Sequence, residues 1–142
     1  MPFTALGLGP KITKAVREAG YEEPTPIQTK AIPAILEGRD VIGVAQTGTG
    51  KTAAFVLPML EKMQTRGPSR CMRALVIAPT RELVVQIEEN VQAYGRHLHL
   101  KYKTIYGGVG EQPQIDALRR GVDFVVATPG RLMDLMARNF VD

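Results

Sequence analysis

After Asp40 the chain alternates short apolar runs with amphipathic helical segments, and this alternation constrains the fold more than any other feature. Four segments predict strands: Val41-Ile42-Gly43-Val44-Ala45, Ala74-Leu75-Val76-Ile77-Ala78, Lys103-Thr104-Ile105-Tyr106 and Phe124-Val125-Val126-Ala127. Near-continuous apolar strands separated by helices are typical of a parallel sheet that helices cover on both faces. The sequence therefore predicts an α/β fold built on a parallel sheet.

Helices are predicted between these strands and ahead of the first one. They run from Pro10 to Ala19, from Pro26 to Gly38, from Lys51 to about Met63, from Arg81 to about Tyr94, from Glu111 to Arg120 and onward from Pro129. Gly20 is placed to end the first helix, and Thr25-Pro26 is an N-cap followed by a proline in the first helical position. Pro33 removes a backbone donor inside the second helix, so we expect it to distort that helix or shorten its regular part.

Length and composition exclude several classes of protein. The 142 residues fit one domain with a core of its own. No apolar run approaches the roughly 18 residues that a membrane span needs, and the first residues do not form a signal peptide. Cys71 is the single cysteine, so no internal disulfide can form and we expect a cytoplasmic setting. The net charge of +4 suits an anionic partner such as nucleic acid, as it suits many unrelated proteins.

Polar or glycine-rich residues follow three of the predicted strands, beginning at Gln46, Pro79 and Thr128. Ligands of parallel α/β sheets bind beyond the carboxyl ends of the strands. We therefore expect the functional residues to gather at that edge of the sheet.

A glycine-rich segment lies between the first predicted strand and its helix: Ala45-Gln46-Thr47-Gly48-Thr49-Gly50-Lys51-Thr52. Its glycines allow successive backbone N–H groups to point at a phosphate, and the start of the helix adds the positive end of its dipole. Lys51 is placed to reach the outer phosphates of a nucleotide, and the Thr52 hydroxyl to ligate Mg²⁺. The strict phosphate-loop pattern has glycine where this chain has Ala45. A plain glycine turn is the alternative, which the order of strand, loop, Gly-Lys-Thr and helix argues against.

Hydrolysis of a nucleotide also needs an acid at the end of a neighbouring strand, to hold the metal and direct water. No carboxylate directly follows a predicted strand, and Glu88-Glu89 lie well inside a helix. We therefore expect Lys51 and Thr52 to be the catalytic residues that this chain supplies, and the hydrolytic acid to be missing.

The N-terminal segment and the phosphate loop together resemble the DEAD-box RNA helicases of superfamily 2. The opening of the sequence resembles that of the bacterial members. Five motifs stand in family order: the Q motif at Gly20-Tyr21-Glu22-Glu23-Pro24-Thr25-Pro26-Ile27-Gln28 with Phe3 upstream, the phosphate loop, motif Ia at Pro79-Thr80-Arg81-Glu82-Leu83, the doublet Gly107-Gly108, and motif Ib at Thr128-Pro129-Gly130-Arg131. The resemblance extends over essentially all 142 residues. It implies a RecA-like fold, with the Q-motif region at 3–28 and the phosphate loop and RNA contacts within 40–142.

The resemblance assigns adenine recognition to Tyr21 and Gln28. The Gln28 amide offers a donor and an acceptor together, which suits the N6–N7 edge of adenine. Tyr21 is expected to stack on the base. The alternatives are a core aromatic at Tyr21 and a helix-surface residue at Gln28.

Motifs Ia and Ib share one arrangement, in which a threonine opens a helix and an arginine stands in its first turn. Arg81 and Arg131 oppose the helix dipole there, at a cost of about 0.3–1 kcal/mol, which makes sense if an anion shares the site. We expect Pro79-Thr80-Arg81, Gly107-Gly108 and Thr128-Pro129-Gly130-Arg131 to hold successive phosphates of an RNA strand, with little sequence specificity. The alternatives are salt bridges from the arginines to Glu82 and Asp134, and a plain turn at the glycines.

The family pattern continues beyond this sequence, which ends before the Asp-Glu-Ala-Asp run, the Ser-Ala-Thr motif and the second RecA-like lobe. The resemblance therefore implies the incomplete first domain of an ATP-dependent RNA helicase, with ATP and Mg²⁺ as cofactors. A non-catalytic nucleotide or nucleic-acid binding module is the alternative for the isolated chain. Motifs Ia and Ib argue against a P-loop kinase or GTPase.

Overall fold

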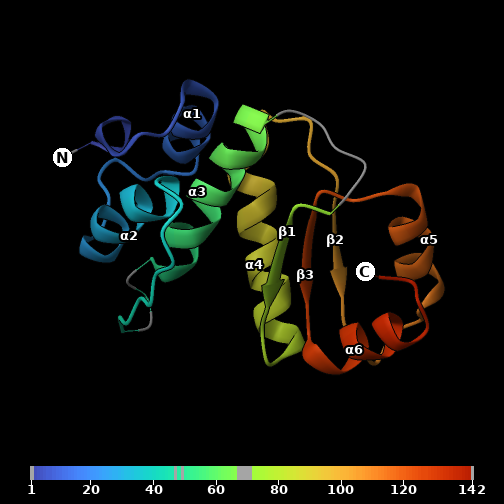
Figure 1. Cartoon of the computed structure of the whole chain (residues 1–142). Helices are drawn as coiled ribbons and strands as arrows, with labels where there is room; N and C mark the ends of the chain where they lie inside the picture. Colours follow the sequence, from blue (N-terminus) through green and yellow to red (C-terminus); the bar gives the residue numbers. More distant parts are fainter. Residues whose placement is uncertain (1, 47, 49, 67–71, 142) are drawn as a thin grey trace. The chain divides into compact units, whose positions relative to one another are not determined.

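The computed structural model describes residues 2–46, 48, 50–66 and 72–141 (Figure 1). Its elements are η1 (Phe3–Leu6), α1 (Pro10–Glu18), α2 (Pro26–Leu36), α3 (Lys51–Arg66), β1 (Ala74–Ile77), α4 (Arg81–Tyr94), β2 (Tyr102–Ile105), α5 (Gln112–Arg120), β3 (Phe124–Ala127) and α6 (Pro129–Ala137). They form two compact units, a first of Met1–Gly67 with Asn90–His99 and a second of Pro68–Glu89 with Leu100–Asp142. None of the described helices is long and apolar enough to cross a membrane.

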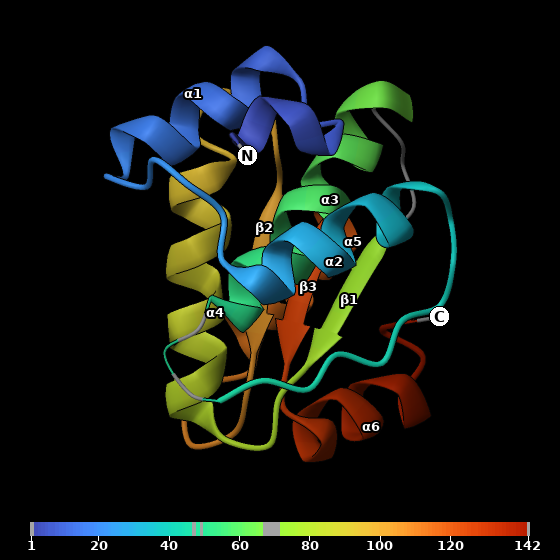
Figure 2. The same cartoon turned by 90° about the vertical axis from the view of Figure 1, so that its left-hand side faces the viewer.

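The first unit is helical, and its core forms where apolar side chains of α1, α2 and α3 meet. Figures 1 and 2 both place α2 beside α3. The most deeply buried side chains of this unit are Ile12, Ala15, Val16, Ile32, Val56, Leu57, Leu60 and, from the end of α4, Val91. Glu61 of α3 accepts a hydrogen bond from the backbone N–H of Gly9, 2.6 Å away, which satisfies a free donor at the start of α1.

The predicted starts of the first two helices, at Pro10 and Pro26, are confirmed, and their ends at Glu18 and Leu36 lie one and two residues before the predicted ones. α1 ends where Gly20 takes up a left-handed φ of +92°, and α2 begins at Pro26 behind Thr25. α2 continues through Pro33, which has no backbone N–H to donate, and ends at Leu36, two residues before the predicted end at Gly38. The shorter helix agrees with the expectation for Pro33.

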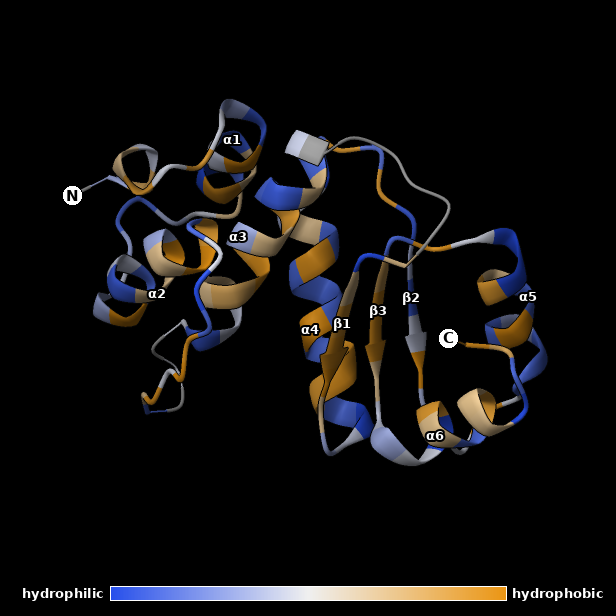
Figure 3. Ribbon diagram, in the orientation of Figure 1, coloured by the Kyte–Doolittle hydropathy of each residue, from blue (hydrophilic) through white to orange (hydrophobic). Residues whose placement is uncertain are grey.

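The second unit is built on a parallel sheet in the order β1-β3-β2. All four residues of the central strand β3 are buried, as the near-continuous apolar run predicts. Figure 3 shows this strand as apolar along its length. The parallel α/β fold is therefore confirmed for this part of the chain.

Helices cover the two faces of this sheet. Val125 and Ala127 of β3 and Ile105 of β2 form a buried cluster with α5 and α6, to which Ile115 and Leu135 belong. Phe124 and Val126 are buried as well, and successive strand residues point to opposite faces. Figure 1 shows the first turns of α4 on the side of the sheet away from α5.

A buried carboxylate fastens the amino ends of the strands. Asp123 accepts hydrogen bonds from Arg73 Nη2 at 3.2 Å and from the backbone N–H of Lys101 at 3.1 Å. Its backbone carbonyl accepts from the N–H groups of Arg73 and Ala74. Asp123, the residue directly before β3, therefore links the starts of both neighbouring strands.

The strand predicted at 41–45 is wrong. Residues 41–46 carry no strand pairing, and the side chains of Ile42 and Val44 are 96% and 87% exposed. A strand requires a neighbour whose ladder hydrogen bonds satisfy its backbone. The described strands pair only among themselves, as β1 with β3 and β3 with β2, so this apolar segment has no strand partner.

Candidate nucleotide and nucleic-acid interface

The carboxyl ends of the three strands lie in register. Ile77 of β1 and Ile105 of β2 are both Cα partners of Ala127, the last residue of β3. The ladders continue one step further, because the N–H of Ala78 donates to Ala127 O and the N–H of Thr128 donates to Ile105 O. Motif Ia, the glycine doublet and motif Ib therefore leave the sheet side by side, as the sequence predicts.

Arg81 lies over the loop that follows β2. Its guanidinium carbon is 5.4 Å from the centre of the Tyr106 ring, close enough for a cation–π interaction. Gly108 is nearby, since a Cβ atom built there would lie 3.8 Å from Arg81 Nη1. The side chain of Arg81 itself remains exposed. Contact with Tyr106 thus holds a solvent-facing cation next to the glycine doublet.

Arg131 reaches the same loop from α6. Its Nη1 donates to Gln114 Oε1 at 3.0 Å, and its Nη2 donates to the backbone carbonyl of Val109 at 3.2 Å. A guanidinium carries five N–H donors, so these two bonds leave three for a ligand. The two arginines therefore contact the loop after β2 at different points and both keep donors available.

The alternative of salt bridges to Glu82 and Asp134 is wrong within the described part of the chain. No ion pair joins Arg81 to Glu82 or Arg131 to Asp134. Asp134 instead pairs with Arg138, which also pairs with Glu111 and holds the pKa of the Glu111 carboxyl below its ordinary value. The charges of Arg81 and Arg131 are thus not neutralised by those acids.

The two helix starts differ in how they are capped. Thr80 Oγ1 accepts a hydrogen bond from the N–H of Leu83 at 3.2 Å, as an N-cap does. Thr128 occupies the N-cap position of α6 without a side-chain capping bond. The Thr128 hydroxyl therefore binds no N–H group in the first turn of α6.

Two glycines at this edge have no structural reason to be glycine. Gly107 and Gly130 have no left-handed φ, and a Cβ at either would meet nothing within 4 Å. Gly108 differs, because its φ of +83° favours glycine for the turn itself. Open space beside Gly107 and Gly130 would admit a ligand backbone at close range.

The phosphate loop lies in the first unit and is described in part. Gly48 and Gly50 have φ values of +84° and +82°, which only glycine adopts readily. Lys51 is exposed at the first position of α3, and half-buried Thr52 follows it. Ala45 and Gln46 lead into the loop, whereas Thr47 and Thr49 lie outside the described residues.

Gln28 is buried, with 3% of its surface exposed, so a helix-surface position is wrong for this residue. Its Oε1 accepts from the N–H of Thr25 at 3.0 Å, and its Nε2 donates to the carbonyl of Gly50 at 3.1 Å. One bond completes the start of α2, and the other ties α2 to the phosphate loop. An amide in this position retains one N–H and one lone pair for a further partner.

Tyr21 follows the end of α1 and is 51% exposed, so it is not a core aromatic. Its ring centre lies 6.3 Å from that of Tyr94, at an angle of 60° between the planes. Burial, the neighbouring Tyr21 hydroxyl and a hydrogen bond with it all raise the pKa of the Tyr94 hydroxyl above its ordinary value. Phe3, the upstream aromatic, is buried in η1 and serves the core.

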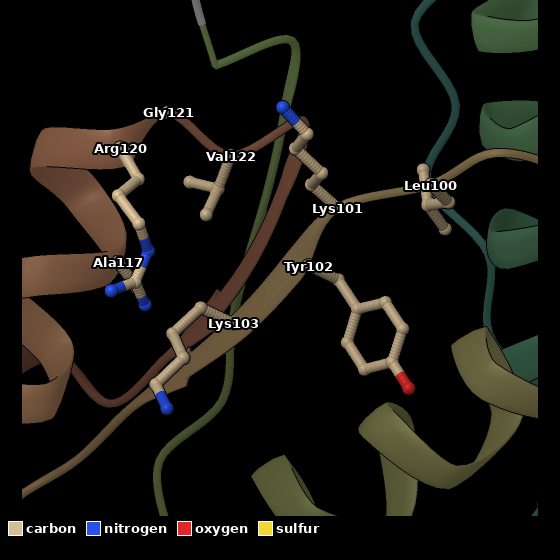
Figure 4. A pocket seen from close by; sticks show the side chains of 8 residues that line it. All are labelled: Leu100, Lys101, Tyr102, Lys103, Ala117, Arg120, Gly121 and Val122. Atoms are coloured by element: carbon tan, nitrogen blue, oxygen red, sulfur yellow. The ribbon is translucent and has the colours of Figure 1, made fainter.

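A cationic hollow of about 430 Å³ lies between β2 and the end of α5. Figure 4 shows two of the cations that line it: Arg120, whose side chain extends from the end of α5 past Ala117, and Lys103, which projects from β2. Both cations have ordinary structural reasons to be there. Lysine on an edge strand such as β2 discourages pairing with other chains, and arginine in the last turn of a helix complements its dipole.

Residues 25–142 match the DEAD/DEAH box helicases. The chain belongs to this family. It is 47% identical to the ATP-dependent RNA helicase CshA of Limosilactobacillus reuteri. The match covers 99% of this chain and 28% of that relative. It is 51% identical over 97% of its length to the DEAD-box ATP-dependent RNA helicase CshA of Streptococcus pneumoniae, covering 26% of that protein. This DEAD/DEAH box chain thus spans little more than a quarter of either relative.

A solved structure extends the match to three dimensions. The crystal structure of a hypothetical ATP-dependent RNA helicase from Sulfolobus tokodaii superposes with a TM-score of 0.83 at 42% identity. The match covers 93% of this DEAD/DEAH box chain and 37% of the other. The fold is accordingly RecA-like, as the motifs predict.

Sequence reasoning missed three residues at these sites. Gln114 and Tyr106 hold the two arginines, and Tyr94 lies against Tyr21. One signal was available for Gln114: it precedes Ala117 and Leu118 by three and four positions, which puts an amide on the apolar face of α5. A polar side chain at a core position of a helix indicates a buried hydrogen bond.

Replacing Gly50 with alanine should destabilise the chain more than the same change at Gly48. Both glycines are left-handed, so alanine carries a similar backbone cost at each, on the order of 1–2 kcal/mol. Only at Gly50 would the new Cβ collide, at 2.2 Å from Gln28 Nε2. Urea unfolding measures both variants, with Gly48→Ala as the matched control. Equal losses of stability at the two positions would contradict the contact between Gln28 and the loop.

Proposed function

We propose that this chain is the ATP-binding and RNA-binding front portion of an ATP-dependent RNA helicase. The observation that carries the proposal is the alignment of motif Ia, the glycine doublet and motif Ib at one edge of the sheet, in a member of the DEAD/DEAH box helicase family. Two arginines that form no ion pair with the described residues flank a loop with open space beside its first glycine. The phosphates of an RNA strand fit this arrangement, because backbone contacts position a nucleic acid without reading its sequence.

The nucleotide is assigned to the first unit. Gly48, Gly50 and the start of α3 would bind its phosphates, with Lys51 reaching the outermost ones. The Thr52 hydroxyl would give Mg²⁺ one protein ligand, which suits an ion that keeps several waters and takes its other ligands from phosphates. When bound, Mg²⁺ would supply charge neutralisation on the phosphates. Gln28 and Tyr21 would recognise adenine, since the Gln28 amide keeps one donor and one acceptor beside the loop.

Phosphate release from ATP by this chain should remain at background, with or without RNA. No carboxylate directly follows β1, β2 or β3, so the strand ends described here lack an acid that holds the metal or orients water. The chain alone therefore fits a binding module better than a hydrolase. RNA-stimulated release that Lys51→Ala abolishes would show that a carboxylate elsewhere in the chain does this work.

ADP should bind more tightly than GDP, by roughly tenfold or more, because a mispaired polar group in a buried site costs about 1–3 kcal/mol. Calorimetry on the chain measures both affinities. Gln28 also supports the phosphate loop, so Gln28→Ala should weaken both nucleotides and, in addition, remove the difference between them. Lys30→Ala, at an exposed position of the same helix, is the control. A preference for ADP that survives in Gln28→Ala would remove the assignment to adenine.

Replacing Arg81 or Arg131 with glutamine should weaken binding of single-stranded RNA for all sequences alike. The slope of log K against log salt should fall by roughly one unit per variant, because one phosphate contact is lost. Arg120→Gln removes the same charge at the other end of the second unit and controls for net charge. Fluorescence anisotropy at several salt concentrations gives both quantities. A lower melting temperature with an unaltered slope would assign the arginine a structural role.

A further inference from the structure

Gln114 is one of the few buried polar side chains of the described chain, with 3% of its surface exposed. It lies in the first turn of α5 and occupies a position on the apolar face of that helix. A buried amide without hydrogen bonds costs about 1–3 kcal/mol, so its partners have to be present in the folded chain. Those partners belong to two different candidate RNA-binding motifs.

Both ends of the Gln114 amide are engaged across long sequence separations. Nε2 donates to the carbonyl of Tyr106 at 3.0 Å, directly before the glycine doublet. Oε1 accepts from Nη1 of Arg131 at 3.0 Å, in motif Ib. Arg131 Nη2 then donates to the carbonyl of Val109, directly after the doublet. Gln114 and Arg131 thus hold the glycine loop on both of its flanks.

This arrangement restrains a side chain that otherwise samples many rotamers. A free arginine loses about 2 kcal/mol of rotamer entropy when a ligand fixes it. Here the amide oxygen of Gln114 binds Nη1 of Arg131, and the carbonyl of Val109 binds Nη2. The folded protein therefore already restricts the rotamers of Arg131 before RNA binds. A side chain that is ordered before binding gains affinity for its ligand in this way.

We propose that Gln114 is a positioning residue for RNA: it joins Arg131 to the Gly107-Gly108 loop so that motif Ib and the glycine doublet bind the RNA backbone as one preformed unit. This inference rests on the proposed RNA-binding function. Gln114 touches no phosphate itself and acts through Arg131 and the Tyr106 carbonyl. Its side chain is neutral, which separates its role from a charge effect.

The test uses the whole chain and a fluorescein-labelled single-stranded oligouridine, followed by anisotropy at several salt concentrations. Gln114→Met removes both hydrogen bonds at nearly constant volume, and Gln114→Asn keeps an amide that is one methylene too short to span both partners. Gln112→Met is the matched control, because Gln112 lies in the same helical turn, is exposed and bonds only to Asp116 at 2.8 Å. Circular dichroism confirms that each variant is folded at the temperature used.

We expect Gln114→Met or Gln114→Asn to weaken RNA binding about tenfold, as residues in one hydrogen-bond network do, while Gln112→Met changes nothing. The salt slope should fall by roughly one unit although no charge is removed, because Arg131 loses its place against a phosphate. Combining either Gln114 variant with Arg131→Gln should weaken binding no more than about twofold beyond Arg131→Gln alone, whereas independent sites would give about a hundredfold loss.

A folded Gln114 variant with unchanged affinity and slope, beside an Arg131→Gln variant that loses both, would overturn the inference and leave RNA binding in place. Multiplicative losses in the double variant would overturn it as well. If Arg81→Gln and Arg131→Gln both bind RNA like the unaltered chain, the proposed function itself fails, and the inference with it.

Discussion

The parallel ladder that β3 forms with both of its neighbours determines where every candidate RNA contact lies. Parallel strands point their carboxyl ends to one edge, and the register here makes Ile77 and Ile105 end level with Ala127. Three loops that are far apart in sequence therefore emerge together. The buried carboxylate of Asp123 supports the opposite edge by bonding to the starts of β1 and β2. The site is thus a consequence of strand pairing before any single side chain contributes.

Two buried glutamines organise the loops, one in each unit. Gln28 joins the start of α2 to the phosphate loop through Gly50, and Gln114 joins the glycine loop to Arg131. An amide suits this task because it donates and accepts at once without carrying a charge that burial would penalise. The amide of each glutamine is therefore hydrogen-bonded to two separate segments of the chain. A substitution at either glutamine should therefore disturb both of its loops together.

The strand predicted at 41–45 and the alternative of salt bridges at Arg81 and Arg131 failed for the same reason. Residues 41–45 read as a buried strand, yet the described strands offer them no partner and their apolar side chains are exposed. Arg81 and Arg131 had acids close in sequence, yet Arg131 bonds to Gln114 and Val109 and Arg81 lies over Tyr106. Nearness along the chain does not decide which groups meet, because the fold brings distant segments together.

Features that depend on a few neighbouring residues were readable from the sequence alone. Helix starts at prolines, ends at glycines such as Gly20 and Gly121, the apolar core strand and the order of the family motifs all belong to this class. The helix ends and the core strand rest on backbone sterics, capping and periodicity, which act over a few residues, and the motif order rests on the resemblance to the family. Strand partners, the bond from Gln28 to Gly50 and the contacts of Gln114 and Tyr94 are of another kind. They join residues eight to several dozen positions apart, so only the packed tertiary structure determines them.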